Sequence, residues 1–145
     1  MIAVDTNLLI YAHRGECEWH EKALAALTEL AEGSAPWAIP WPCAHEFLAI
    51  VTHPRIYVPP TPLEQALEAL EIWVVAPGCR LIGEGPGYFE ILRQLAAEHH
   101  VVGPMIHDAR VAAICLHNGV SELWTLDRDF SRFAALKVRN PLSGS

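Results

Sequence analysis

Short runs of β-favouring residues alternate with amphipathic stretches along the whole chain. Apolar residues recur every three or four positions in the amphipathic stretches, whereas the β-type runs are brief and bounded by Gly, Pro or polar residues. We therefore expect strands at residues 2–4, 36–41, 80–82, 122–126 and 136–138. We expect helices from about residue 8, over 18–30, around and after Pro42, and over 63–74, 88–99 and 108–117.

This alternation predicts the fold class. Strands that alternate with helices build a mainly parallel sheet covered by helices on both faces, so we predict an α/β fold. A chain of 145 residues has the size of one domain. Because the sequence shows no repeat and no linker, we place a single domain at residues 1–141 and a short C-terminal tail at 142–145.

Composition narrows the class of protein. The chain is 52% hydrophobic and 19% charged, which is typical of a globular domain rather than a disordered segment. Its four cysteines are scattered, without a C-x-x-C pair, so we expect reduced thiols and no zinc knuckle. There is no basic signal region and no membrane-spanning apolar run, so we expect a cytoplasmic protein.

The formal net charge is −7, whereas nucleic-acid binders usually carry a basic surface. The acidic residues also have a pattern, because Asp5, Glu46, Asp108 and Asp127 each follow an expected strand or lie near the start of the next helix. In a parallel sheet these positions share one edge, where ligands bind. Clustered carboxylates need a cation, and hard oxygen ligands suit Mg²⁺ or Mn²⁺. Such ions can also bridge an acidic cleft to a polyanion.

Each of these acidic residues also has a simpler explanation. The side chain of Asp5 can cap the first helix, a role that Asn7 can share. Asp108 can complement a helix start, and Asp127 can form a turn. Glu46 can be a solvated helix residue, although its apolar sequence neighbours favour a carboxylate with a partner.

Four segments taken together resemble a known family: VDTNLLIYA, HEFLAIVTHPR, HDARVAAICLHNG and TLDRDF. In this order they are similar to the PIN-domain ribonucleases, and closely to the VapC toxins of toxin–antitoxin modules, from residue 2 to about residue 141. The resemblance implies a three-layer α/β/α sandwich and a Mg²⁺- or Mn²⁺-dependent endoribonuclease. It also implies a homodimer that is neutralised by a cognate VapB-type antitoxin, whose helix would enter an apolar groove near the acidic site.

The resemblance carries the family's acidic residues over to Asp5, Glu46, Asp108 and Asp127, with no departure at these positions, and we expect all four to be catalytic and to bind the metal. Asp129 matches the second aspartate of the last motif, as an auxiliary ligand or a group that supports the ligands. We expect Asn7 and Thr125 to orient carboxylates. The implied reaction is attack of a metal-activated water on an RNA phosphodiester.

Basic and aromatic residues near these motifs allow two interpretations. Phosphate contact and ordinary salt bridging are equally plausible for each arginine near the acidic motifs, namely Arg14, Arg110, Arg128 and Arg132. Trp37, Trp41 and Tyr57 can stack on unpaired bases, but packing is the more common role. We also expect packing or capping roles for His45 and His107, because adjacent helical residues point about 100° apart.

Two other functions compete with an RNA-cleaving toxin. A catalytically silent PIN-like domain would act by binding its partner, and through that partner DNA. A structure-specific DNA nuclease would apply the same metal chemistry to DNA.

Overall fold

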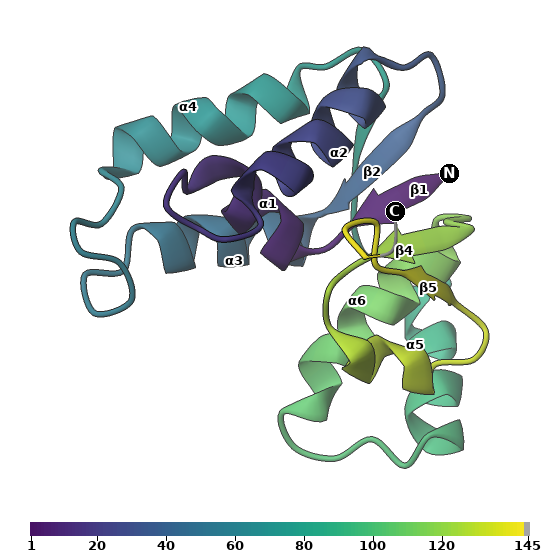
Figure 1. The fold of residues 1–145 in the computed structure, drawn as a ribbon. Coiled ribbons are helices and arrows are strands. Elements are labelled where there is room, and N and C mark those ends of the chain that lie inside the picture. The colour runs from purple at the N-terminus through teal and green to yellow at the C-terminus, as the bar shows by residue number, and fades with distance from the viewer. Residues whose placement is uncertain (144–145) are drawn as a thin grey trace.

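The computed structural model describes residues 1–143, which form five strands and six α-helices (Figure 1). A 3₁₀ helix, η1, lies near the C-terminus. In chain order the elements are β1 (Ile2–Val4), α1 (Thr6–His13), α2 (His20–Glu32), β2 (Trp37–Pro40), α3 (Trp41–Val51), α4 (Leu63–Val74), β3 (Cys79–Ile82), α5 (Tyr88–Glu98), α6 (Met105–His117), β4 (Glu122–Trp124), η1 (Arg128–Arg132) and β5 (Lys137–Arg139).

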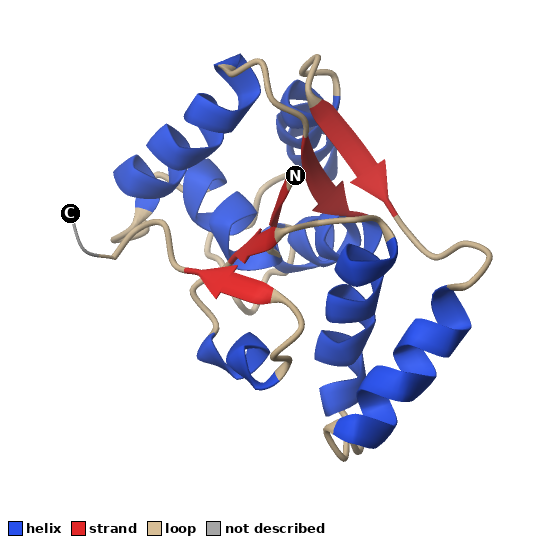
Figure 2. Ribbon diagram, turned by 90° about the vertical axis from the view of Figure 1, so that its right-hand side faces the viewer, coloured by secondary structure: helices blue, strands red, loops and turns tan. Residues whose placement is uncertain are grey.

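The strands form one sheet in the order β3-β2-β1-β4-β5, and every neighbouring pair is parallel. The first strand therefore lies in the centre, with β2 on one side and β4 on the other (Figure 2). The chain first adds strands on the β2 side and then crosses to the β4 side. Ligands of open parallel sheets bind beyond the carboxyl ends of the strands at this reversal.

Two groups of buried apolar side chains cover the two faces of the sheet. The first joins α1, α2, α3 and α4, with Leu8, Leu27 and Phe47 among its fully buried members. The second joins α5, α6 and η1, with Ile114 and Phe130 among its members. The predicted α/β fold with a mainly parallel sheet between two layers of helices is thus confirmed (Figure 1).

Several boundaries differ from the expected ones. Helix α6 begins at Met105, not at Asp108, because Pro104 occupies its N-cap position and the turn at Gly103 already starts the helical bonding. The expected strand at 122–126 ends at Trp124, and the last strand begins one residue later than expected. The sequence pattern gave no sign of the η1 helix.

The expected C-terminal tail is partly packed. Leu142 is buried in the first apolar group, whereas residues 144–145 lie outside the described residues. No helix within residues 1–143 combines the length and the apolar content that crossing a bilayer requires.

Candidate active site

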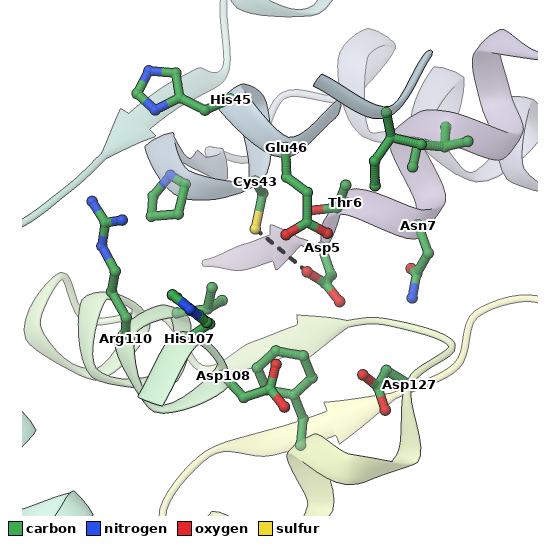
Figure 3. A pocket seen from close by; sticks show the side chains of 15 residues that line it. Asp5, Thr6, Asn7, Cys43, His45, Glu46, His107, Asp108, Arg110 and Asp127 are labelled. Carbon is green, nitrogen blue, oxygen red and sulfur yellow. Dashed lines mark hydrogen bonds between the residues drawn. The ribbon is translucent and has the colours of Figure 1, made fainter. Parts of the chain in front are cut away.

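A pocket of about 330 Å³ opens at the carboxyl ends of the central strands. Asp5 follows β1, Glu46 projects from α3, Asp108 lies in the first turn of α6, and Asp127 follows β4 by way of Thr125 and Leu126. All four carboxylates line the pocket, although they come from distant parts of the sequence (Figure 3).

Asp5 is the most enclosed of these acidic residues, with only 8% of its surface exposed. Its backbone N–H donates to the carbonyl of Trp124 at 3.0 Å, which fixes the end of β1 against β4. One carboxylate oxygen, Oδ2, accepts a hydrogen bond from the hydroxyl of Thr125 at 2.8 Å. The other, Oδ1, accepts one from the buried thiol of Cys43 at 3.4 Å. These contacts hold the carboxylate in one orientation within the pocket lining.

Thr125 connects three parts of the site. Besides donating to Asp5, its hydroxyl oxygen accepts from the Asn7 side-chain amide at 3.2 Å and from the backbone N–H of Asp127 at 3.0 Å. Asn7 therefore acts on Asp5 through Thr125. The amide donor also fixes the direction of the hydroxyl, because an oxygen that accepts from Asn7 and Asp127 presents its hydrogen to Asp5.

The side chains of Asp5 and Asp127 differ in helix capping. Asp5 occupies the N-cap position of α1, but its side chain makes no capping hydrogen bond, so that explanation of the carboxylate is wrong. Asp127 does cap η1, since its Oδ1 accepts from the backbone N–H of Asp129 at 2.9 Å. That bond is compatible with a ligand role, because a carboxylate has further lone pairs to offer.

Asp108, Asp127 and Asp129 form the tightest acidic group. Each offers one carboxylate oxygen, and these oxygens lie within 4.8 Å of one another, a spacing that allows them to hold one metal ion. Asp129 is exposed at the edge of this group, whereas Asp108 and Asp127 are half-buried. Asp5 lines the same pocket, and its charge acts on Asp108.

The local electrostatics favour a bound cation. Burial raises the pKa of Asp5, against the hydrogen bond from Thr125, which lowers it. Burial also raises the pKa of Asp108, with further contributions from the charges of Asp127 and Asp5. Full ionisation of the cluster is thus unfavourable without a counter-charge, and carboxylate oxygens are the ligands that Mg²⁺ and Mn²⁺ prefer. The donor set fits such an ion.

Glu46 lies across the pocket from this group. Its surroundings are not the apolar ones that its sequence neighbours suggested. Its apolar neighbours Phe47 and Val51 point into the core, whereas Glu46 is exposed at the pocket. The pocket walls still remove part of its hydration. This partial burial, followed by the charges of Asp5 and Asp108, raises the pKa of Glu46.

Sequence reasoning missed two histidines of the pocket wall. His45 and His107, expected to have packing or capping roles, both line the pocket and are exposed (Figure 3). Although a histidine and the next residue diverge on one helix, α3 and α6 face each other across the hollow, so both members of each pair reach it. Cys43 was missed as well, because its sequence context carries no sign of its contact with Asp5.

The four arginines occupy different surroundings. Arg110 lines the pocket and pairs with Glu84 at 2.8 Å. Arg132 donates to the backbone carbonyl of Asp129 at 3.0 Å. Arg128 is exposed beside Asp127, outside the pocket lining. The Arg14 side chain bonds Glu16, Thr61 and the carbonyl of Pro59, which gives it a structural role away from the pocket lining.

The chain matches the PIN domain family model over residues 2–136. It is 31% identical to Ribonuclease VapC48 of Mycobacterium tuberculosis over 140 residues, 97% of each chain. It is 34% identical to VapC ribonuclease Mb2897 of Mycobacterium bovis over 144 residues, 99% of this chain and 97% of the relative.

A solved structure supports the fold independently. VapBC2 from Rickettsia felis, solved bound to a DNA fragment from its promoter, superposes with a TM-score of 0.71 at 19% identity, covering 96% of this chain and 98% of the other. The family match at residues 2–136 includes strands β1 to β4 and every residue that lines the acidic pocket, whereas β5 lies beyond it. The chain therefore belongs to the PIN domain family, among the relatives of the VapC ribonucleases.

Proposed function

We propose that the protein is a Mg²⁺- or Mn²⁺-dependent endoribonuclease, the toxin of a toxin–antitoxin pair. The observation that carries this proposal is the convergence of Asp5, Glu46, Asp108 and Asp127 on one pocket. The names of its relatives, which are ribonucleases, supply the substrate class.

In this proposal the acidic residues have different roles. Asp108, Asp127 and Asp129 offer the three grouped ligand oxygens, and Asp5 adds a fourth carboxylate from the same pocket. A divalent cation held there would lower the pKa of a bound water and would neutralise charge on a phosphodiester. Glu46 stands opposite, with a raised pKa that suits a carboxylate able to accept a proton from the attacking water.

The basic wall offers contacts for the RNA backbone. Arg110, His45 and His107 line the same pocket as the carboxylates, so a phosphate near the acidic group would lie beside them. This local arrangement is how a chain with a net charge of −7 can approach a polyanion. We assign the first role to Arg110 because it lines this pocket, whereas Arg14, Arg128 and Arg132 do not.

We also propose two protein partners. Leu63 and Leu67, one turn apart on α4, are 59% and 40% exposed, and an apolar surface of this kind supports a homodimer. A VapB-type antitoxin would lie over the pocket, where Ile10 and Ile50 add apolar side chains beside the acidic group. The four free cysteines support a reducing, cytoplasmic setting.

The test of function is digestion of folded RNA by the purified protein with Mn²⁺. We expect cleavage that EDTA stops and that both Asp5→Asn and Asp108→Asn abolish, while circular dichroism shows both variants folded. A matched control, Glu90→Gln, removes an exposed charge on α5 and should cleave normally.

The same assay separates the competing functions. DNA supplied together with RNA should survive, whereas preferential loss of DNA would identify a DNA nuclease. Binding to the partner without Mn²⁺-dependent digestion of any substrate would identify a silent PIN-like domain. RNA cleavage by Asp5→Asn at the wild-type rate would remove the acidic pocket from the mechanism.

A further inference from the structure

Two aromatic side chains, His45 and Trp41, lie side by side at the edge of the pocket. His45 lines the pocket, and the Trp41 ring lies beside it, with the ring centroids 5.7 Å apart and the planes tilted by 31°. Trp41 and His45 are one helical turn apart at the start of α3, so they share one face of that helix. Trp41 lies just beyond the pocket lining, and His45 connects it to the hollow.

Core packing does not account for Trp41. The inward side of α3 is filled by Cys43, Ala44 and Phe47, which are all buried. Trp41 is instead 43% exposed, in contrast to Trp37, which is fully buried as expected. A Cβ added at Gly83 would meet Trp41 Cδ1 at 3.4 Å, so one edge of the indole lies close to Gly83. The side chain is thus near the chain at one edge and partly open to solvent.

We propose that Trp41 and His45 form a stacking platform for an unpaired nucleobase of single-stranded RNA, one that flanks the phosphodiester in the acidic pocket. This inference rests on the proposed function, because it assigns a subsite to the same substrate. Aromatic side chains are the usual surfaces on which proteins hold unpaired bases. A strand leaving the acidic group along the basic wall reaches His45 first and Trp41 next.

The shape of the surface favours a base over a protein side chain. Binding anchors in protein interfaces fill pockets, whereas Trp41 is a partly exposed ring next to a second ring. Arg110, on the same wall as His45, pairs with Glu84 and would offer a contact to the RNA backbone. Every base has a π-face, so stacking here fixes the position of the strand without selecting one base.

Binding experiments can isolate the platform. Fluorescence anisotropy would compare a fluorescein-labelled single-stranded RNA of about 12 nucleotides with an abasic ribose-phosphate chain of the same length and charge. The proteins would be wild type, Trp41→Ala, Trp41→Phe and Trp19→Ala. Trp19 is the matched control, because it is 36% exposed at the start of α2 and lies outside the pocket lining.

We expect Trp41→Ala to weaken RNA binding by between about 5-fold and 100-fold. Its affinity for the abasic chain should equal that of wild type, Trp41→Phe should recover most of the RNA affinity, and Trp19→Ala should bind as wild type. Equal affinity of wild type and Trp41→Ala for RNA would overturn the proposal, as would equal weakening towards both chains. Unchanged RNA binding with weakened antitoxin binding would overturn it too and assign Trp41 to the protein partner.

The two proposals fail separately. If RNA binds through Trp41 but is not cleaved with Mn²⁺, the stacking platform remains and the nuclease function is excluded. If Trp41→Ala and wild type cleave RNA with the same KM and kcat, the stacking platform is excluded and the nuclease function remains.

Discussion

The hydroxyl of Thr125 donates a 2.8 Å hydrogen bond to Oδ2 of Asp5, across 120 positions of sequence. Both residues are buried, and each follows one of two neighbouring parallel strands, β1 and β4. The same hydroxyl oxygen accepts from Asn7 and from the backbone of Asp127. A single small side chain thus sets the relative positions of two proposed ligands.

Replacing Thr125 by Val keeps the shape of the side chain but removes the hydroxyl. Asp5 would lose its shortest hydrogen bond, and the Asp127 backbone N–H would lose its acceptor. We expect Mn²⁺-dependent RNA cleavage to fall by about 10- to 100-fold, as when a group supporting a metal ligand is removed. The loss of a buried hydrogen bond should also destabilise the fold by about 1–3 kcal/mol.

Thr125→Ser is the matched control, because it keeps the hydroxyl and loses only a methyl group. It should retain most of the activity, and urea unfolding would give the stability of both variants. Full activity in Thr125→Val would show that the bond to Asp5 does not serve the reaction.

The Cys43 thiol should be chemically inert. Burial raises the pKa of Cys43 well above its usual value, with a further contribution from the charge of Asp5, and it raises the pKa of Cys115 to about 12. Since the thiolate is the reactive form, iodoacetamide at about pH 8 should modify the half-buried Cys17 well before these two. Mass spectrometry of the native protein measures this order, and modification of Cys43 as fast as Cys17 would contradict it.

Asp108 should impair the stability of the metal-free protein. Its pKa is raised by burial and by the charges of Asp127 and Asp5, so its ionised form is unfavourable at neutral pH. We expect Asp108→Asn to unfold a few degrees higher than wild type without metal, a gain of about 1 kcal/mol or less. Mn²⁺ at about 100 times its Kd should stabilise wild type by about 2.7 kcal/mol and the variant much less.

The control for this experiment is Glu90→Gln, which lies on α5 in a solvent-exposed pair with Arg93. Differential scanning calorimetry with and without Mn²⁺ should show that variant behaving as wild type. An Asp108→Asn melting temperature that rises with Mn²⁺ as much as that of wild type would exclude Asp108 as a ligand.

The stability difference between wild type and Asp108→Asn should depend on pH. A carboxyl group whose pKa is raised by folding binds more protons in the folded state than in the unfolded state within the window between the two values. Its contribution to stability is complete below the ordinary pKa of aspartic acid and is lost as the pH rises through the folded value. The difference should therefore shrink as the pH falls from about 7 to about 4. A difference that grew on acidification would reverse the assigned sign.

The parallel sheet and the acidic positions were predictable because their signals are local. Asp5 directly follows a strand pattern, and Asp108 lies near a helix start, so the edge rule for parallel sheets places them together. The start of α6 also had a local signal in Pro104, which the prediction passed over.

The basic and aromatic wall was not predictable in this way. His45 and His107 reach one hollow only because α3 and α6 face each other across it, and that relation depends on the packing of both helices on the sheet. The exposure of Trp41 likewise depends on how the start of α3 packs near Gly83, the residue that follows β3. A helical pattern describes one helix at a time, so it carries no information on such facing surfaces.

The central claim is that carboxylates from distant segments share a divalent cation, and anomalous diffraction from Mn²⁺-soaked crystals tests it most directly. We predict a manganese peak within about 2.5 Å of carboxylate oxygens of both Asp108 and Asp127, with Asp5 and Glu46 facing it. A pocket without a manganese peak at saturating Mn²⁺, or a peak bound to one carboxylate alone, would contradict the account.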